Sequence, residues 1–242
     1  MEKIKKWLLG EVWEGYSLFE KLFLIGMLLL QIVVFFIMPD SPIGVISGIS
    51  GVLSVVLCAK GKISFYYVGF IQTISYLYLA WNAKFYGEVI ENLFYLVTMV
   101  MGIFMWKKHM IQNADGTKQV AARKFTPLQW LGSIVISVLG TIGMGFALTK
   151  IGSAQAYTDA ATNVFAIFGQ ILMIKRFKEQ WIWWLLIDLF CIKLWFVQGN
   201  WSMVAMYVAW TANCIYGWYT WSKLNKKAEA IGEIALLEGE AA

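Results

Sequence analysis

Long apolar stretches separated by short polar breaks run along most of the chain. A helix that crosses a hydrocarbon layer of about 30 Å needs roughly 20 mostly apolar residues, and eight stretches meet this requirement. They run over Lys21–Met38, Ile43–Ala59, Ile63–Asn82, Gly87–Trp106, Leu128–Leu148, Tyr157–Ile174, Trp181–Gln198 and Trp201–Trp221. Strands are a poor alternative, because the stretches are longer than barrel strands and do not alternate polar with apolar positions. The pattern predicts an all-α integral membrane protein with eight transmembrane helices.

The composition agrees with a membrane protein and argues against a soluble enzyme. Of the 242 residues, 60% are apolar and 14% are charged, whereas soluble domains average about 45–50% and about 25%. The chain also contains 13 tryptophans, a residue that gathers at membrane–water interfaces and on binding surfaces. A soluble fold of this size could not bury so much apolar surface.

The basic residues predict the orientation of the helices. Loops that carry Lys and Arg lie on the cytoplasmic side of a membrane. With a cytoplasmic N-terminus, 17 of the 20 basic residues lie inside, and only Lys84 and Lys150 lie in outer loops. Both termini are therefore expected in the cytoplasm. The formal charge of +5 then reports orientation, and we expect no nucleic-acid partner.

Three segments lie outside the predicted helices. Residues 1–20 mix aromatic and charged residues and are expected to form an interfacial segment. Residues 107–126 form a basic cytoplasmic loop, and residues 223–242 form an acidic cytoplasmic tail that we expect to fray.

The sequence contains an internal repeat. A shift of 115 residues superimposes spans two to four on spans six to eight without a gap, and it pairs Gly102 with Gly217 and Trp106 with Trp221. The repeat predicts two parallel three-helix units, residues 43–106 and 157–222. A linker helix at 127–150 joins them, and an extra helix at 21–38 precedes them. Transporters are commonly built from such repeats, with a substrate site near the middle of the membrane.

Polar and aromatic side chains at mid-membrane depth are the candidate site residues, because an unpartnered polar group in lipid is costly. Aromatic rings beside amides and a carboxylate suit a small, flat, polar ligand. The candidates are Gln72, Tyr76, Asn92, Tyr95, Thr98, Trp181, Trp184, Asp188, Trp210 and Asn213. Cys191 and Trp195 share the helical stripe of Asp188.

Structural roles compete with each of these assignments. Asn, Gln and Thr in spans often only bridge helices. Tryptophans near span ends are usually interfacial anchors, and this interpretation covers Trp81, Trp106, Trp130, Trp201 and Trp221. A carboxylate at the depth of Asp188 needs a partner or stays protonated. Lys193 could be that partner, although a spacing of five residues is poor helical geometry.

Few residues are candidates for metal binding or catalysis. The single histidine, His109, lies in the basic loop, and the three cysteines lie in apolar stretches without metal-binding spacing. We therefore predict no catalytic residues, no metal and no cofactor.

The penultimate span carries the motif W-x-x-W-x-x-x-D at Trp181, Trp184 and Asp188, and the last span carries W-x-x-N at Trp210 and Asn213. With the repeat pattern, these motifs resemble PnuC-type vitamin transporters over roughly residues 20–224. The resemblance implies a three-plus-one-plus-three fold like that of SWEET sugar transporters and a homotrimer in a bacterial inner membrane. It also implies uptake of nicotinamide riboside, a precursor of NAD, by facilitated diffusion with alternating access. Intracellular phosphorylation would then trap the nutrient.

The resemblance also assigns roles within the candidate site. The nicotinamide ring would stack among Trp184, Trp210 and Tyr95. Its amide and the ribose hydroxyls would bond Gln72, Asn92, Thr98 and Asn213. Two alternatives stay open: a transporter of thiamine or a sugar in a related fold, and a membrane-embedded enzyme.

Overall fold

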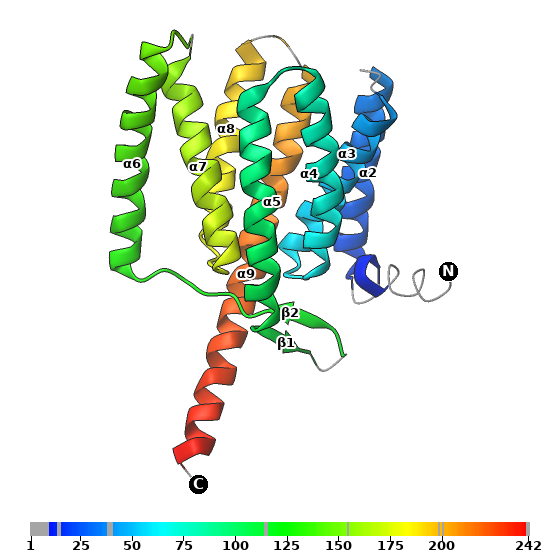
Figure 1. Cartoon of the computed structure of the whole chain (residues 1–242). Coiled ribbons are helices and arrows are strands. Elements are labelled where there is room, and N and C mark those ends of the chain that lie inside the picture. Colours follow the sequence, from blue (N-terminus) through cyan, green and yellow to red (C-terminus); the bar gives the residue numbers. More distant parts are fainter. Residues whose placement is uncertain are drawn as a thin grey trace. The chain divides into compact units, whose positions relative to one another are not determined.

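The computed structural model is helical and describes residues 10–13, 16–37, 41–113, 116–153, 155–197, 199 and 201–240 (Figure 1). The helices are α2 (Leu18–Ile37), α3 (Pro42–Ala59), α4 (Ser64–Asn82), α5 (Tyr86–Lys107), α6 (Pro127–Lys150), α7 (Ala156–Ile174), α8 (Gln180–Val197) and α9 (Trp201–Glu240). Each overlaps one predicted span. Five of them, α2, α3, α5, α6 and α8, are long and apolar enough to cross a membrane by length and composition alone. The all-α prediction is confirmed.

Two helices, α3 and α6, begin one residue earlier than predicted, at positions set by N-terminal caps. The hydroxyl of Ser41 accepts the Gly44 N–H at 3.1 Å, and Pro42 occupies the first turn of α3. Thr126 and Gln129 form a reciprocal capping box at the start of α6. Such caps satisfy backbone groups that a helix start leaves unpaired.

Two segments outside the spans also differ from expectation. The basic loop contains an antiparallel pair of strands, β1 (Met110–Gln112) and β2 (Lys118–Val120). The acidic tail, expected to fray, is helical in its described part, since α9 continues to Glu240. Residues 1–9 and 14–15 of the interfacial segment, together with the span ends Met38 and Gln198, lie outside the described residues.

The chain divides into two compact units. Unit 1 comprises residues 1–121 and 226–242, and unit 2 comprises residues 122–225. Unit 1 thus contains α2 to α5, the strands and the end of α9, whereas unit 2 contains α6 to α8 and the first part of α9.

In unit 1, a glycine brings an aromatic ring onto a neighbouring helix. A Cβ on Gly102 would lie 2.1 Å from the hydroxyl of Tyr66, so only glycine fits there. The ring of Tyr66 meets that of Trp106 edge-on, with centroids 5.2 Å apart. The described part of the N-terminal segment belongs to this unit and contacts α3 there, because Lys60 Nζ and Glu20 Oε1 are 2.6 Å apart.

Unit 2 repeats this arrangement 115 residues later. A Cβ on Gly217 would lie 2.4 Å from the indole of Trp181, and the Trp181 ring meets Trp221 edge-on at 6.1 Å. A second aromatic cluster surrounds Trp183, which packs with Phe165 and Phe168.

These contacts overturn the interpretation of two tryptophans as interfacial anchors. Trp106 and Trp221 have 0% of their surface exposed, because each packs with a ring lodged against a glycine. Trp81 and Trp201, in contrast, are exposed as an anchor would be.

Backbone conformation recurs at the same offset. Gly61 and Arg176, which end the turns after α3 and α7, both have φ of 66°. Lys84 and Gly199, which lie in the turns after α4 and α8, have φ of 60° and 69°. The left-handed conformation costs a non-glycine residue about 1–2 kcal/mol. Arg176 and Lys84 therefore keep the conformation of their equivalent glycines although their own side chains disfavour it.

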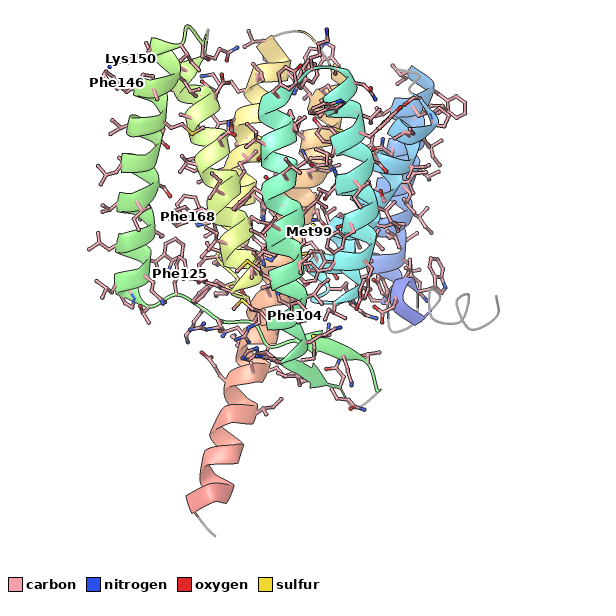
Figure 2. All side chains as sticks on the ribbon, in the orientation of Figure 1. Met99, Phe104, Phe125, Phe146, Lys150 and Phe168 are labelled. Atoms are coloured by element: carbon pink, nitrogen blue, oxygen red, sulfur yellow. The ribbon has the colours of Figure 1, made fainter. Side chains whose placement is uncertain are left out.

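Apolar side chains project outward along the helices, as expected in lipid. Figure 2 shows this along α6, where Phe146 is exposed and the Lys150 amine lies 4.5 Å from its ring centroid. The Lys150 amine thus lies over the ring of Phe146 at the end of α6.

Candidate functional site

The ten predicted residues divide equally between the two units. Unit 1 contributes residues on α4 and α5, and unit 2 contributes residues on α8 and α9. On α4 and α5 these are Gln72, Tyr76, Asn92, Tyr95 and Thr98. On α8 and α9 these are Trp181, Trp184, Asp188, Trp210 and Asn213.

On α4, Gln72 lies at the contact with α3. Its Cγ is 3.4 Å from the position that a Cβ on Gly51 would take, and its Oε1 accepts the Thr73 hydroxyl at 3.1 Å. Tyr76, one turn further, is exposed along part of its ring. Its hydroxyl lies near the Glu88 carboxyl of α5.

On α5, the predicted polar side chains use their donors within their own helix. Asn92 donates to the Glu88 carbonyl at 2.8 Å, and Thr98 donates to the Phe94 carbonyl at 2.8 Å. Both side chains are buried. The Asn92 amide oxygen can accept hydrogen bonds as well, since an amide oxygen carries two lone pairs.

Glu91 is a residue that the sequence reasoning missed. The Tyr95 hydroxyl donates to Glu91 Oε1 at 2.6 Å. The spacing of four residues between a carboxylate and a phenol on one helix was the available signal. The Glu91 carboxylate therefore fixes the orientation of the Tyr95 side chain.

On α8, two tryptophans are seated against glycines of neighbouring helices. Trp181 lies against Gly217, as described above, and Trp184 lies against α7. A Cβ on Gly169 would be 2.9 Å from the indole of Trp184. The absence of a side chain at these glycines fixes the depth of both rings.

Asp188 of α8 is buried and bonds a residue of α9. It is 5% exposed, and the thiol of Cys214 donates to its Oδ2 at 3.3 Å. Tyr207 of α9 lies near Cys191 and Trp195 of α8. Among the described residues, Lys193 forms no ion pair with this carboxylate and is exposed, so the predicted counter-ion is wrong. The partner is the Cys214 thiol, which only the packing of α8 on α9 reveals.

On α9, Trp210 and Asn213 complete the unit 2 residues. The rings of Trp210 and Tyr207 meet edge-on with centroids 5.5 Å apart. Asn213 is 3% exposed, and its Oδ1 has no hydrogen-bond partner among the described residues. Buried polar atoms are nearly always paired, so such an atom calls for a specific explanation.

The turn between α7 and α8 carries a second group of buried polar residues. Burial raises the pKa of the Glu179 carboxyl, whereas the Phe125 N–H and nearby lysines act to lower it. Burial, together with the positive charge of Arg123, lowers the pKa of Arg176 to about 10.

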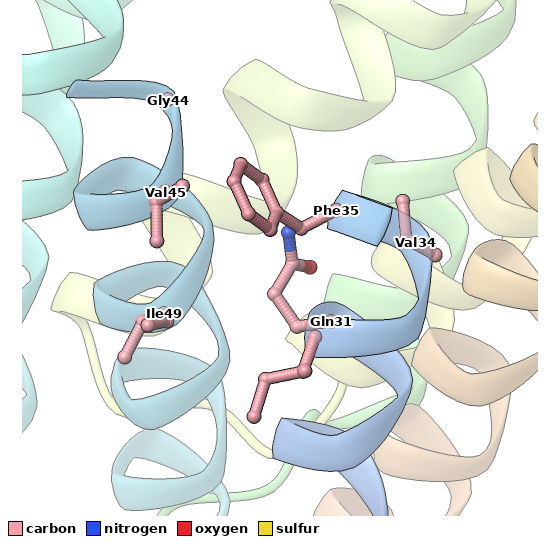
Figure 3. A pocket seen from close by; sticks show the side chains of 7 residues that line it. Gln31, Val34, Phe35, Gly44, Val45 and Ile49 are labelled. Atoms are coloured by element: carbon pink, nitrogen blue, oxygen red, sulfur yellow. The ribbon is translucent and has the colours of Figure 1, made fainter. Parts of the chain in front are cut away.

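A groove lies elsewhere, between α2 and α3 of unit 1 (Figure 3). Gln31 reaches across to α3, where a Cβ on Gly48 would lie 2.3 Å from its Nε2. None of the ten predicted residues lines this groove. The described residues also contain no cluster of three or more His, Cys, Asp or Glu side chains that could hold a metal.

Comparison with known proteins adds a family to this geometry. Residues 41–223 match the family described as nicotinamide mononucleotide transporter. The nicotinamide riboside transporter PnuC of Haemophilus influenzae is 39% identical over 88% of this chain and 93% of its own. The PnuC of Neisseria mucosa is 37% identical over 91% of this chain and 87% of its own. A crystal structure of the vitamin B3 transporter PnuC matches with a TM-score of 0.78 at 36% identity, covering 92% of this chain and 98% of that one.

Proposed function

The chain belongs to the nicotinamide mononucleotide transporter family, and from this premise we propose that it carries nicotinamide riboside across a bacterial inner membrane. The observation that carries the proposal is the match, over nearly the whole of both chains, to relatives named as nicotinamide riboside transporters.

The ten predicted residues form the binding site in this proposal. The chemistry of unit 2 supports it: Trp184 and Trp210 offer rings on which a pyridine can stack, and Asp188 offers a carboxylate for its positive charge. The unpaired Oδ1 of Asn213 can accept a hydrogen bond from the carboxamide or a ribose hydroxyl.

The same chemistry favours the riboside over the mononucleotide. A phosphate group is bound by Arg, Lys or a helix N-terminus. None of the ten residues is basic, and Asp188 would repel the phosphate. The phosphorylated nutrient would thus be rejected, so intracellular phosphorylation traps it.

Transport proceeds by alternating access and facilitated diffusion, with residues 43–106 and 157–222 as parallel repeats in a SWEET-like arrangement of eight spans. The matched contacts at Gly102 and Gly217 and the matched φ values of Gly61 and Arg176 support the repeats. Cytoplasmic termini and a homotrimer complete the proposal, the first from the distribution of basic residues and the second from the family resemblance.

Binding and flux measurements on the purified protein test the function. Calorimetry in detergent should show binding of nicotinamide riboside and none of thiamine, glucose or nicotinamide mononucleotide. Proteoliposomes should equilibrate labelled nicotinamide riboside without an ion gradient or ATP. Binding of thiamine or glucose in its place would assign the chain a different substrate, and indifference to all four compounds would refute the proposal.

A further inference from the structure

The segment Lys118–Phe125, here called the strap, consists of β2 and the residues that connect it to α6. It crosses the boundary between the two units. Its first part is bonded within unit 1. The Gln119 side-chain amide donates to the Lys60 carbonyl at 2.9 Å, and the Val120 N–H donates to the Gly61 carbonyl at 2.9 Å. The Ala121 N–H donates to the His109 carbonyl at 2.8 Å. The strap is therefore held by unit 1 up to Ala121.

The second part of the strap is bonded within unit 2. The Asn225 side-chain amide donates to the Ala122 carbonyl at 3.2 Å. The Arg123 N–H donates to the Arg176 carbonyl at 2.7 Å, and the Lys178 N–H returns a bond to the Arg123 carbonyl at 2.9 Å. The Arg123 guanidinium also lies 4.5 Å from the centroid of the Phe177 ring. Unit 2 therefore holds the strap from Ala122 onward.

The two anchor points are equivalent positions of the repeat. Gly61 and Arg176 lie 115 residues apart, and both adopt φ of 66°. The left-handed conformation takes their carbonyls out of the helical hydrogen-bond pattern, so these carbonyls can accept from the strap. An arginine held in this conformation is strained, and such strain persists where the surrounding structure uses the conformation.

The second covalent connection between the units lies close to the same anchors. The units meet within α9 between Asn225 and Lys226. Asn225 bonds the strap in unit 2, as described above, and the amine of Lys227 bonds the Asn113 side chain of the hairpin in unit 1. Side-chain hydrogen bonds that stay within one unit thus flank both crossings, while the backbone hydrogen bonds of the continuous helix α9 run across the second.

We propose that the Ala121–Ala122 peptide and the adjoining turn of α9 form a hinge on which the two units rotate during transport. The strap keeps the α3–α4 and α7–α8 turns tethered through the cycle, and the larger displacement occurs at the α4–α5 and α6–α7 turns. Rotation at this joint breaks none of the strap's hydrogen bonds described above, because each of them lies on one side of it. The inference rests on the proposed transport function.

Spin-label distances measured on the full-length protein test the hinge. Labels are attached through genetically encoded keto amino acids, which leaves the native cysteines untouched. One pair replaces the exposed Lys118 and Lys175 near the strap anchors, and the other replaces the exposed Lys84 and Lys150 at the opposite ends of the two units. Without ligand, the anchor pair should give a narrow distance distribution. Addition of nicotinamide riboside should shift the distant pair and leave the anchor pair unchanged. Equal shifts in both pairs, or ligand binding without a shift in either, would overturn the hinge.

Variants that loosen the strap supply the second arm. Gln119→Leu combined with Asn225→Leu removes two side-chain bonds that hold it. Asn163→Leu is the matched control, because its amide donates to the Asp159 carbonyl at 2.7 Å on α7, away from the strap. The double variant should broaden the anchor-pair distribution even without ligand and slow uptake by about fivefold or more, with an unchanged Kd. The control should do neither.

The two arms separate the hinge from the function. Absence of nicotinamide riboside binding would refute the proposed function. The distance distribution of the anchor pair without ligand would still test whether the strap tethers the two turns. An anchor pair that is broad in the parent protein, or that the double variant leaves narrow, would refute the tether whatever the ligand.

Discussion

The unpaired side-chain oxygen of Asn213 gives the sharpest test of the proposed site. Asn213→Leu keeps the branched shape and the approximate volume of the side chain but removes Oδ1, which no described residue bonds. If this oxygen accepts a hydrogen bond from the substrate, the variant should bind nicotinamide riboside more weakly. The ligand-free protein should be as stable as the parent or more so, because a buried group without a partner has been removed.

The magnitude follows from the burial of the residue. Asn213 is 3% exposed, so water compensates little for the missing bond. A buried polar atom without a partner costs about 1–3 kcal/mol, and a bound substrate recovers that amount. Since 1.4 kcal/mol is a factor of ten in Kd, the expected loss of affinity is about 5- to 150-fold.

A neighbouring residue provides the matched control. The Thr211 hydroxyl, on the same helix, also has no partner among the described residues. Thr211→Val removes it with little change in shape. Calorimetry and thermal unfolding in one detergent should separate the two variants: both keep or raise the unfolding temperature, and only Asn213→Leu loses affinity. Equal affinities would refute the placement of Asn213 in the site. A fall in affinity matched by a fall in unfolding temperature would make Asn213 a structural residue.

Two further predictions concern unit 2. Trp184→Ala should weaken nicotinamide riboside binding by the loss of stacking, about 1–3 kcal/mol. Trp183→Ala, which empties the cluster with the phenylalanines of α7, should mainly lower the unfolding temperature; the reverse outcome would exchange their roles. The raised pKa of Glu179 means that the folded protein binds this proton more tightly than the unfolded chain, so its contribution to stability falls as pH rises from the ordinary value through the folded one. Glu179→Gln should therefore unfold at a higher temperature than the parent at high pH, with a difference that shrinks on acidification; a difference that grows on acidification would contradict this.

The helices could be predicted from sequence because lipid imposes a length and an apolar composition on each. The recurrence of the glycine–aromatic contacts at an offset of 115 residues could be predicted because equivalent glycines and tryptophans keep that offset. The continuation of α9 past the membrane had a readable signal in its Ala-, Glu- and Leu-rich end, residues that favour helix. The β-hairpin had none of comparable strength, since its strands have three residues each.

The partners of the site residues needed the tertiary structure. The sequence marked Asp188 as a carboxylate in need of a partner, but the choice between Lys193 and Cys214 depends on how α9 packs against α8. Composition likewise cannot distinguish an interfacial tryptophan from a buried one. Trp106 and Trp221 each follow a glycine by four residues, and that spacing marks the close approach which buries them.

The two units share a backbone pattern but not its chemistry. In unit 1, Gly69 of α4 faces Ser54 of α3, and a Cβ on the glycine would lie 3.0 Å from the serine hydroxyl.

In unit 2 the glycine lies on the other helix of the pair. Trp184 of α8 stands at the position equivalent to Gly69, and it faces Gly169 of α7, which stands at the position equivalent to Ser54. The hydrogen bond of Thr73 to Met99 in unit 1 likewise becomes that of Cys214 to Asp188 in unit 2.

One copy of the repeat thus has Gly69 and the Thr73 hydroxyl where the other has the indole of Trp184 and the carboxylate of Asp188. A symmetric ligand would gain nothing from this difference. Under the proposed function, the indole of Trp184 and the carboxylate of Asp188 in unit 2 suit the flat cationic ring of nicotinamide riboside.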